Sequence, residues 1–192
     1  MEESDILRVI SGTARGHKLK TLKGSNTRPT SDRVKESLFN IISGYIIDAD
    51  VLDLFAGTGN LGIEALSRGA GSAVFVDKSR ECCEIIKDNL AHTKLSDKAA
   101  VIPGDIKAEI EKLYKEGKKF DIIFLDPPYN KNFVTETLYY LAKNDIIKFN
   151  GILVGERDYI DEVPEEVGIF RLIRNERYGD TVLSFYKPHT GQ

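Results

Sequence analysis

Two short motifs hold the residues of this chain that could do chemistry. The first runs from Asp53 to Gly62 and reads Asp-Leu-Phe-Ala-Gly-Thr-Gly-Asn-Leu-Gly. Its glycines let the backbone turn sharply and let a ligand approach closely, and a helix that follows would offer unpaired N–H groups. Asp77 stands 20 residues after Gly57, the spacing at which an acidic side chain binds ribose hydroxyls. The motif predicts a nucleotide-binding loop.

Residues around the glycines limit the kind of nucleotide. Ile63 stands where a phosphate-binding P-loop has lysine. Asp53 places a carboxylate beside the loop, which disfavours a pyrophosphate and suits a ligand with an ammonium or sulfonium group. We therefore expect a cationic nucleotide. The alternative is that Asp53 and Asp77 only cap the turn and the helix that follow them.

The second motif, Asp126-Pro-Pro-Tyr129, closes the apolar stretch 120–125. An exocyclic amino group of a nucleobase is a poor nucleophile, because its lone pair is delocalised into the ring. The Asp126 carboxylate and the Pro127 carbonyl could accept its two N–H bonds and localise that lone pair. Pro127 and Pro128 stiffen the turn, and Tyr129 offers a face for base stacking. The motif predicts direct methyl transfer to a base, with a rigid structural turn as the alternative.

The surrounding elements must bring both motifs together. From residue 51 onward, short β-branched stretches alternate with stretches of helical period, which is typical of a mostly parallel sheet covered by helices. We expect strands at residues 51–55, 73–77, 99–103, 120–126, 152–156, 168–174 and 181–187. Residues 175–180 are too few for a crossover helix, so the last two strands should form an antiparallel hairpin. Both motifs would then face one crevice at the carboxyl edge of the sheet.

The N-terminal segment reads as a separate basic element. Residues 7–11 and 18–22 flank a glycine turn and predict a hairpin, and residues 30–32 supply caps for a helix that begins after Pro29. Between residues 6 and 35, eight basic residues face Asp32 alone, so this segment carries +7 and the remainder −10. A basic arm on an acidic body favours contact with a polyanion, and a solvated charged hairpin is the alternative. We expect 1–28 as an appendage, 29–188 as the main domain and 189–192 as a flexible tail.

Length and composition exclude several classes of protein. A chain of 192 residues suits one domain with a small appendage. No stretch reaches the roughly 18 apolar residues that a membrane span needs, and the start of the chain is acidic where a signal peptide is basic. Cys82 and Cys83 are neighbours that could form only a strained bridge, which fits a reducing cytoplasm. The three histidines form no metal-ligand pattern, so we expect no metal.

The ordered set of motifs resembles the RsmD family, small bacterial enzymes that make N2-methylguanosine in 16S ribosomal RNA. The resemblance covers nearly the whole chain. It is carried by Leu7-Arg-Val-Ile-Ser-Gly12, Arg15-Gly16, Asn26-Thr-Arg-Pro-Thr30, Asp32-Arg-Val-Lys-Glu36, Leu38-Phe-Asn40, Asp53-Leu-Phe-Ala-Gly-Thr-Gly59, Leu61-Gly-Ile-Glu-Ala-Leu-Ser-Arg-Gly-Ala70, Asp126-Pro-Pro-Tyr129 and Tyr178-Gly-Asp-Thr181.

This resemblance implies a Rossmann-like, seven-stranded class I methyltransferase fold with S-adenosylmethionine as the donor. It implies that the donor is held by Asp53, Phe55, Ala56, Gly57, Thr58 and Gly59 at its methionine part, by Asp77 and Lys78 at the ribose, and by Asp105 and Ile106 at the adenine. The catalytic residues would be Asp126, Pro127, Pro128 and Tyr129. The RNA contacts would come from Arg8, Arg15, Lys18, Lys20, Arg28, Arg33 and Tyr129.

The expected partner is 16S ribosomal RNA in an assembled or assembling small subunit, because one short arm would need a pre-shaped substrate. Several alternatives stay open. Asp105 could serve only as a helix start, and Arg28 and Arg33 could be solvated charges at a helix start. An N6-adenine DNA methyltransferase would use the same Asp126 chemistry. A dehydrogenase would leave Asp126-Pro-Pro-Tyr129 unexplained, and a non-catalytic RNA-binding assembly factor would keep the pocket without the reaction.

Overall fold

The computed structural model describes residues 7–22, 31–128 and 133–189. In these residues one sheet holds eight strands in the order β3-β2-β1-β4-β5-β8-β7-β6. The strands are β1 (Asp50–Leu54), β2 (Ser72–Asp77), β3 (Ala99–Pro103), β4 (Phe120–Leu125), β5 (Ile147–Asp158), β6 (Glu166–Val167), β7 (Phe170–Tyr178) and β8 (Thr181–Pro188). The first five pair in parallel and the last three antiparallel.

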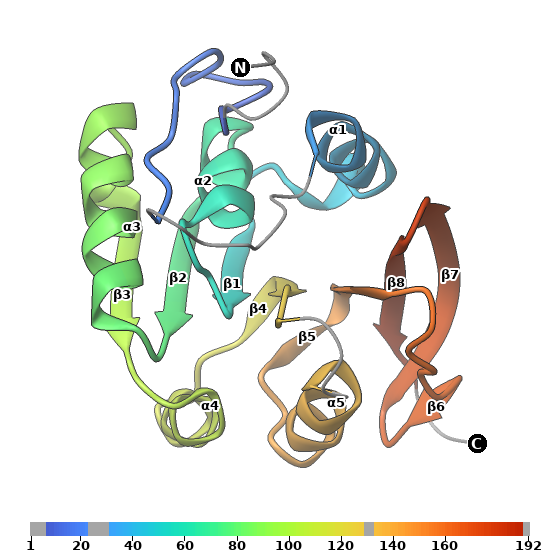
Figure 1. The fold of residues 1–192 in the computed structure, drawn as a ribbon. Helices are drawn as coiled ribbons and strands as arrows, with labels where there is room; N and C mark the ends of the chain where they lie inside the picture. Colours follow the sequence, from blue (N-terminus) through green and yellow to red (C-terminus); the bar gives the residue numbers. More distant parts are fainter. Residues whose placement is uncertain (1–6, 23–30, 129–132, 190–192) are drawn as a thin grey trace.

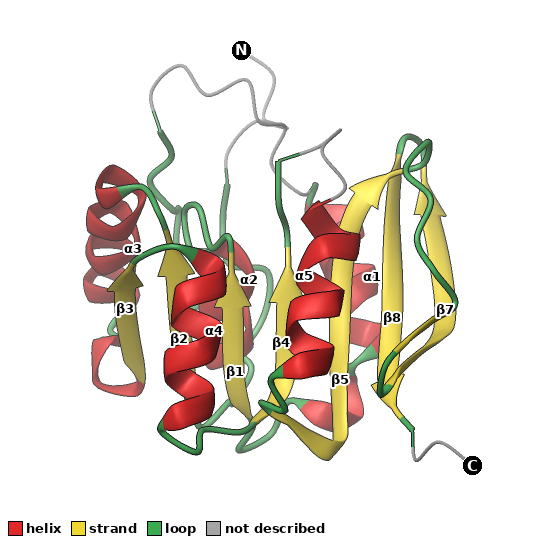
Figure 2. Cartoon of the chain, turned by 90° about the horizontal axis from the view of Figure 1, so that it is seen from below, coloured by secondary structure: helices red, strands yellow, loops and turns green. Residues whose placement is uncertain are grey.

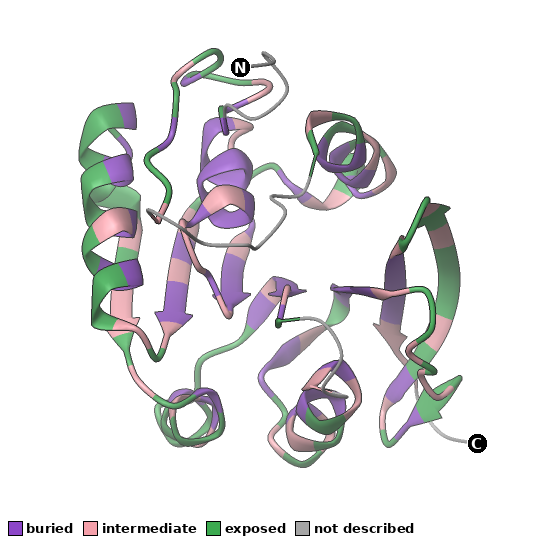
Figure 3. Ribbon diagram, viewed as in Figure 1, coloured by how far each residue is buried: buried purple, intermediate pink, exposed green. Residues whose placement is uncertain are grey.

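Helices cover both faces of this sheet. They are α1 (Asp32–Ile41), α2 (Asn60–Ser67), α3 (Arg80–Thr93), α4 (Ile106–Lys115) and α5 (Phe133–Lys143), with short 3-10 turns η2 (Ser43–Tyr45) and η3 (Ser96–Lys98). Figures 1 and 2 show α1, α2 and α3 on one face and α4 and α5 on the other. Each face buries its own apolar cluster, which Figure 3 shows as the buried strands and inner helix faces.

Side chains alternate between these two clusters along the central strands. Val51 of β1 and Ile122 of β4 lie in the cluster under α1, α2 and α3. Their neighbours Leu52 and Ile123 lie in the cluster under α4 and α5. Residues two apart on a strand share a face, so both faces are apolar and the strands read as nearly continuous hydrophobic stretches.

The expectation of seven strands was wrong by one. All seven expected strands are present, and the additional strand, β6, has two residues and pairs with the outer edge of β7. Two residues are too few to give a periodic signal. Strand β5 also begins at Ile147 rather than at residue 152, because its pairing with β4 shifts register between Phe120 and Ile122 and interrupts the alternation.

The N-terminal hairpin is present but is not a two-stranded ribbon. Arg8 and Lys18 form an isolated antiparallel bridge, and its apolar side chains are buried in the α2 face of the core. The N–H groups of Val9 and Leu19 donate across the hairpin to the His17 and Leu7 carbonyls at 2.9 and 2.8 Å, but the backbone donors that follow Val9 bond elsewhere. The N–H groups of Ile10 and Ser11 donate to the Glu64 carboxylate of α2, at 2.8 and 3.0 Å. The hairpin is thereby fixed to α2.

Candidate functional site

The glycine loop connects β1 to α2 at the carboxyl edge of the sheet. Gly57 and Gly59 have φ angles of 57° and 78°, in the left-handed region that favours glycine. Gly59 is the N-cap of α2, so the first N–H groups of that helix face the loop. Asp77, at the end of the adjacent strand β2, holds the loop because its Oδ2 accepts the Gly57 N–H at 2.8 Å. The loop lies between a strand and a helix, as the sequence predicted.

Asp53 lies beneath the loop and is 2% exposed. Its Oδ2 accepts the Gly62 N–H of α2 at 2.9 Å. Gly62 is required for this approach, because a Cβ there would lie 2.3 Å from the Phe75 ring. Burial, together with the nearby charge of Asp77, raises the pKa of Asp53 to about 8, although the Gly62 N–H works in the other direction. The carboxyl is therefore poised to ionise when a cation binds next to it.

The residues present fit a donor that carries a sulfonium, an ammonium, a carboxylate and a ribose. Asp53 and Asp77 supply negative charge, and the start of α2 supplies N–H groups for a carboxylate. Asp77 uses one oxygen on Gly57 and the other on the Ser79 N–H, each at 2.8 Å. A carboxylate has about four acceptor sites, so both oxygens can still accept from ribose hydroxyls.

The other expected donor contacts surround this loop. Phe55 is half-buried with φ of 61°, Ala56 is buried, and the Thr58 carbonyl accepts from the Asn89 side chain at 2.9 Å. Lys78 is exposed after β2. Asp105 caps α4, with its Oδ1 accepting from the N–H groups of residues 107 and 108, and Ile106 is buried. Capping is thus what Asp105 does in the chain alone, and its adenine contact stays a prediction.

Asp126 follows β4 directly, one strand away from the glycine loop, since β4 pairs with β1. It is half-buried. Burial is the main cause that raises its pKa well above the usual value, and the negative charges of Glu156 and Asp53 add to this effect. The Asp126 carboxyl is therefore held among groups of the same sign of charge. Tyr129, the last residue of the motif, lies outside the described residues.

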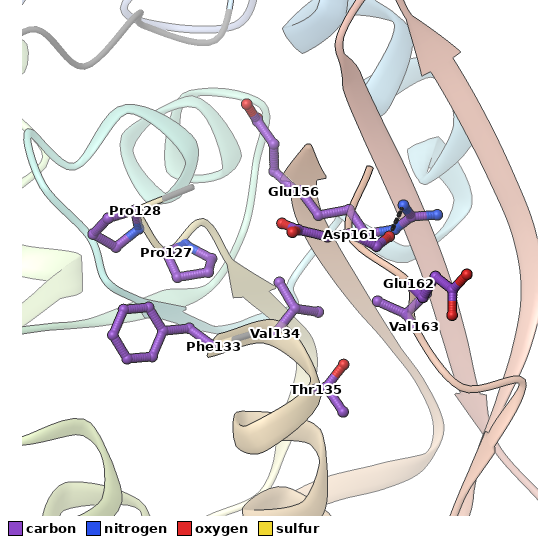
Figure 4. A pocket seen from close by; sticks show the side chains of 10 residues that line it. Pro127, Pro128, Phe133, Val134, Thr135, Glu156, Asp161, Glu162 and Val163 are labelled. Atoms are coloured by element: carbon purple, nitrogen blue, oxygen red, sulfur yellow. Dashed lines mark hydrogen bonds between the residues drawn. The ribbon is translucent and has the colours of Figure 1, made fainter. Parts of the chain in front are cut away.

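A pocket opens beside the prolines of this motif. Figure 4 shows Pro127 and Pro128 on one side, Phe133 and Val134 of α5 below, and Glu156 of β5 opposite. Pro127 is buried and Pro128 is exposed. We assigned no role to Glu156 from the sequence. The available signal was its position at the end of the expected strand 152–156, next to the strand that carries Asp126.

The expected RNA contacts that the structure describes are all exposed, four of them on the hairpin and one on α1. Arg8, Arg15, Lys18 and Lys20 are exposed, while the hairpin's Leu7, Val9 and Leu19 point into the core. Arg8 pairs with Asp32 and Lys20 with Asp88, each at 2.8 Å. Arg33 is exposed on α1, and Arg28 lies outside the described residues.

The described residues show neither a metal-ligand cluster nor a helix suited to a membrane span. Within residues 7–22, 31–128 and 133–189, no three His, Cys, Asp or Glu side chains are grouped so that they could hold a metal ion. None of the helices in this part of the chain combines the length and apolar character needed to cross a membrane.

Comparison with known proteins relates this site to one family. A model of the family described as conserved hypothetical protein 95 matches residues 7–187. A Bacillus subtilis protein, YlbH, provisionally named an rRNA methyltransferase, is 41% identical over 94% of this chain and 98% of its own. The ribosomal RNA small subunit methyltransferase D of Escherichia coli K12 is 33% identical over 94% of this chain and 89% of its own.

A solved structure shows the same fold as this chain. The E. coli protein yhhF, provisionally titled a methyltransferase, matches with a TM-score of 0.83 at 32% identity, over 94% of this chain and 97% of that chain. The Rossmann-like class I methyltransferase fold predicted from the sequence is confirmed, with eight strands in place of seven. The chain therefore belongs to the conserved hypothetical protein 95 family, in agreement with the RsmD resemblance of its motifs.

Proposed function

We propose that this protein transfers a methyl group from S-adenosylmethionine to the N2 amino group of a guanine in 16S ribosomal RNA. The observation that carries the proposal is the position of Asp126, Pro127 and Pro128 at the carboxyl end of β4, beside the glycine loop of β1. A donor site and an acceptor for amino N–H groups then share one edge of the sheet. The names of the relatives, which include a small subunit rRNA methyltransferase, support the same substrate class.

The donor would lie along the ends of β1, β2 and β3. When bound, S-adenosylmethionine supplies an electrophilic methyl group on its sulfonium. Asp53 and the loop 55–59 would hold the methionine part, Asp77 with Lys78 the ribose, and Asp105 with Ile106 the adenine. The raised pKa of Asp53 makes its ionisation depend on the positive charge beside it. The site thereby favours a cationic nucleotide over one that carries phosphates.

The target base would lie against the turn after β4. The Asp126 carboxylate and the Pro127 carbonyl would accept the two N–H bonds of the amino group and direct its lone pair towards the donor. As the new N–C bond forms, the bond from the methyl carbon to the sulfonium sulfur breaks, and the nitrogen loses one proton. A carboxylate with a raised pKa holds a proton more firmly than an ordinary one, so Asp126 is suited to receive it. Tyr129 would stack on the base.

The substrate would be held mainly by the N-terminal segment. We assign residues 1–28, with Arg33, to the RNA-facing surface, because exposed Arg15 and Lys18 lie on a hairpin fixed to α2. An arm of this size favours RNA that proteins have already shaped, so the preferred substrate is an assembled or assembling small subunit in the cytoplasm. Guanine inside such RNA would have to be splayed out to reach the pocket.

Replacing Asp126 tests the catalytic assignment. We expect Asp126→Ala to lower turnover by at least about 100-fold, the range for losing an acid–base group. Affinity for S-adenosylmethionine, measured by calorimetry, should stay within about twofold. Asp97→Ala, at an exposed acid of η3, is the matched control and should leave both quantities unchanged. Near-wild-type turnover of Asp126→Ala would show that the reaction does not depend on this motif.

A further inference from the structure

Glu156 shares a sheet face with Asp126. On β4, Ile122 and Phe124 lie in the cluster under α1 and α2, and on β5 Val154 lies in that same cluster. Since side chains two apart share a face, Asp126 and Glu156 continue these two rows at the carboxyl edge. Arg157, the next residue, lies on the other face and donates to Ser184 Oγ at 2.9 Å and to the Asp161 carbonyl at 2.5 Å.

The register of the sheet makes the two carboxylates neighbours. Phe124 lies opposite Val154 and Leu125 lies opposite Gly155 in the parallel pair of β4 and β5. Asp126 follows Leu125 directly after the end of β4, and Glu156 follows Gly155 on β5, so the two residues take the next positions in this register. Glu156 is 3% exposed and lines the pocket beside the two prolines (Figure 4). Its negative charge is the second largest cause that raises the pKa of Asp126.

The order of strands places Asp126 between two different groups. The glycine loop lies on the β1 side of β4, and Glu156 lies on the β5 side. Asp126 would hold the amino group of the base and turn it towards the donor on the β1 side. The ring of the base would then extend towards β5. The ring atom next to the amino group would then meet the Glu156 carboxylate.

Guanine and adenine differ at that ring atom. In guanine the 2-amino group is adjacent to N1–H, so the two form a continuous donor edge. In adenine the 6-amino group is adjacent to N1, which has a lone pair and no proton. A carboxylate accepts from the first edge and repels the second, and a site built around such a hydrogen bond rejects analogues that lack the proton.

We propose that Glu156 is a specificity-determining residue that accepts the N1–H of the target guanine while Asp126 holds its N2 amino group. This inference rests on the proposed methyl transfer and goes beyond it, because it names the group that separates guanine from adenine. The two neighbouring carboxylates would accept hydrogen bonds from two adjacent donors of guanine, N1–H and the N2 amino group. Asp126 alone would read only an amino group, which both purines carry.

The test uses the full-length protein and two versions of one RNA. The first has guanosine at the methylated position, and the second has 2,6-diaminopurine there, which keeps the 2-amino group but has no proton on N1. We expect the wild-type protein to favour guanosine by at least about 100-fold in kcat/KM. In Glu156→Gln, whose amide can donate to N1, the preference should fall below about 10-fold. Glu156→Asp keeps the carboxylate and should keep the preference for guanosine.

Controls separate this inference from the proposed function. Glu116→Gln, at an exposed acid after α4, should match the wild type in both reactions. Donor affinity and melting temperature report whether Glu156→Gln remains folded. If that variant fails to fold, the wild-type comparison of the two RNAs still decides, because equal rates on both would overturn the inference. An unchanged preference in a folded Glu156→Gln would overturn it as well. Absence of N2-methylguanosine with the wild type would instead refute the proposed function.

Discussion

At the scale of single residues, the burial of Asp53 carries a stability cost beside the donor-binding role that we propose for it. Its carboxyl is buried under the glycine loop and its pKa is raised to about 8. Between about pH 4 and pH 8, the native chain thus holds a proton that the unfolded chain has released. The free energy of unfolding therefore falls as pH rises through this window. Such strain at a binding site is common, because the site is built for the ligand rather than for the free protein.

Asp53→Asn should relieve this cost. We expect the unfolding free energy of the variant, relative to that of the wild type, to be at least about 1 kcal/mol higher at pH 8 than at pH 5. The reason is that one pKa unit corresponds to about 1.4 kcal/mol. Affinity for S-adenosylmethionine should fall at least about 10-fold. Urea unfolding at the two pH values and calorimetry measure these changes. A stability difference that is the same at both pH values would contradict the account.

Residue types alone predicted the glycine loop and the Asp126 motif as site elements, because each is local and its proposed chemistry follows from consecutive residues. Glu156 could not be assigned in this way. Its closeness to Asp126 depends on the register between β4 and β5, which sequence spacing does not fix. The role of Asp105 could not be decided from the sequence for a different reason. A helix cap and an adenine contact use the same residue type at the same position.

At the scale of elements, a buried ionic network joins the hairpin, α1 and α2. The Lys35 side chain is fully buried, and its amino group donates to the Arg8 carbonyl at 2.5 Å and to Asn60 Oδ1 at 2.7 Å. It also lies 3.2 Å from Glu64, which pairs with Arg68 at 2.7 Å. Desolvation lowers the pKa of Lys35, and the charge of Glu64 opposes this effect.

Breaking this network should destabilise the packing of the hairpin and α1 against α2. We expect Lys35→Met to lower the free energy of unfolding by about 3 kcal/mol, because it removes one partner of a buried pair and leaves the Arg8 carbonyl without its donor. Lys87→Met is the matched control, since Lys87 and Glu84 form an exposed pair whose loss should cost less than about 0.5 kcal/mol. Equal losses in the two variants, measured by urea unfolding, would refute the role of burial.

The same network explains why the N-terminal segment was only partly predictable. The glycine turn between residues 7–11 and 18–22 correctly predicted a basic hairpin. The N–H groups of Ile10, Ser11 and Ala14, however, donate to the side chains of Glu64 and Ser67 of α2. Those are contacts between residues more than 50 positions apart. Local patterns describe periodicity, and they do not reveal which distant group satisfies a backbone donor.

At the scale of the whole molecule, the separation of charge matters more than the net value of −3. Arg8, Arg15, Lys18 and Lys20 are exposed on one element, while most acidic residues lie elsewhere in the chain. An acidic body repels RNA and a basic arm attracts it. This arrangement should align the substrate so that the arm, rather than the rest of the surface, contacts phosphates.

Removing two of these charges tests the arm. We expect Arg15→Ala combined with Lys18→Ala to weaken RNA binding and to reduce the slope of log affinity against log salt by about 1 to 2, as phosphate contacts are lost. Donor affinity should not change. Lys115→Ala, at an exposed lysine of α4, is the control and should leave the slope unaltered. A double variant with the wild-type slope would mean that the hairpin does not contact phosphates.

The central claim is that this pocket methylates N2 of guanine in small-subunit RNA. Nucleoside mass spectrometry tests it most directly, after incubation with labelled S-adenosylmethionine and, separately, unmodified small ribosomal subunits, protein-free 16S RNA and duplex DNA. We expect labelled N2-methylguanosine, with more product from subunits than from free RNA. Labelled N6-methyladenine in DNA, or no product despite donor binding, would contradict it.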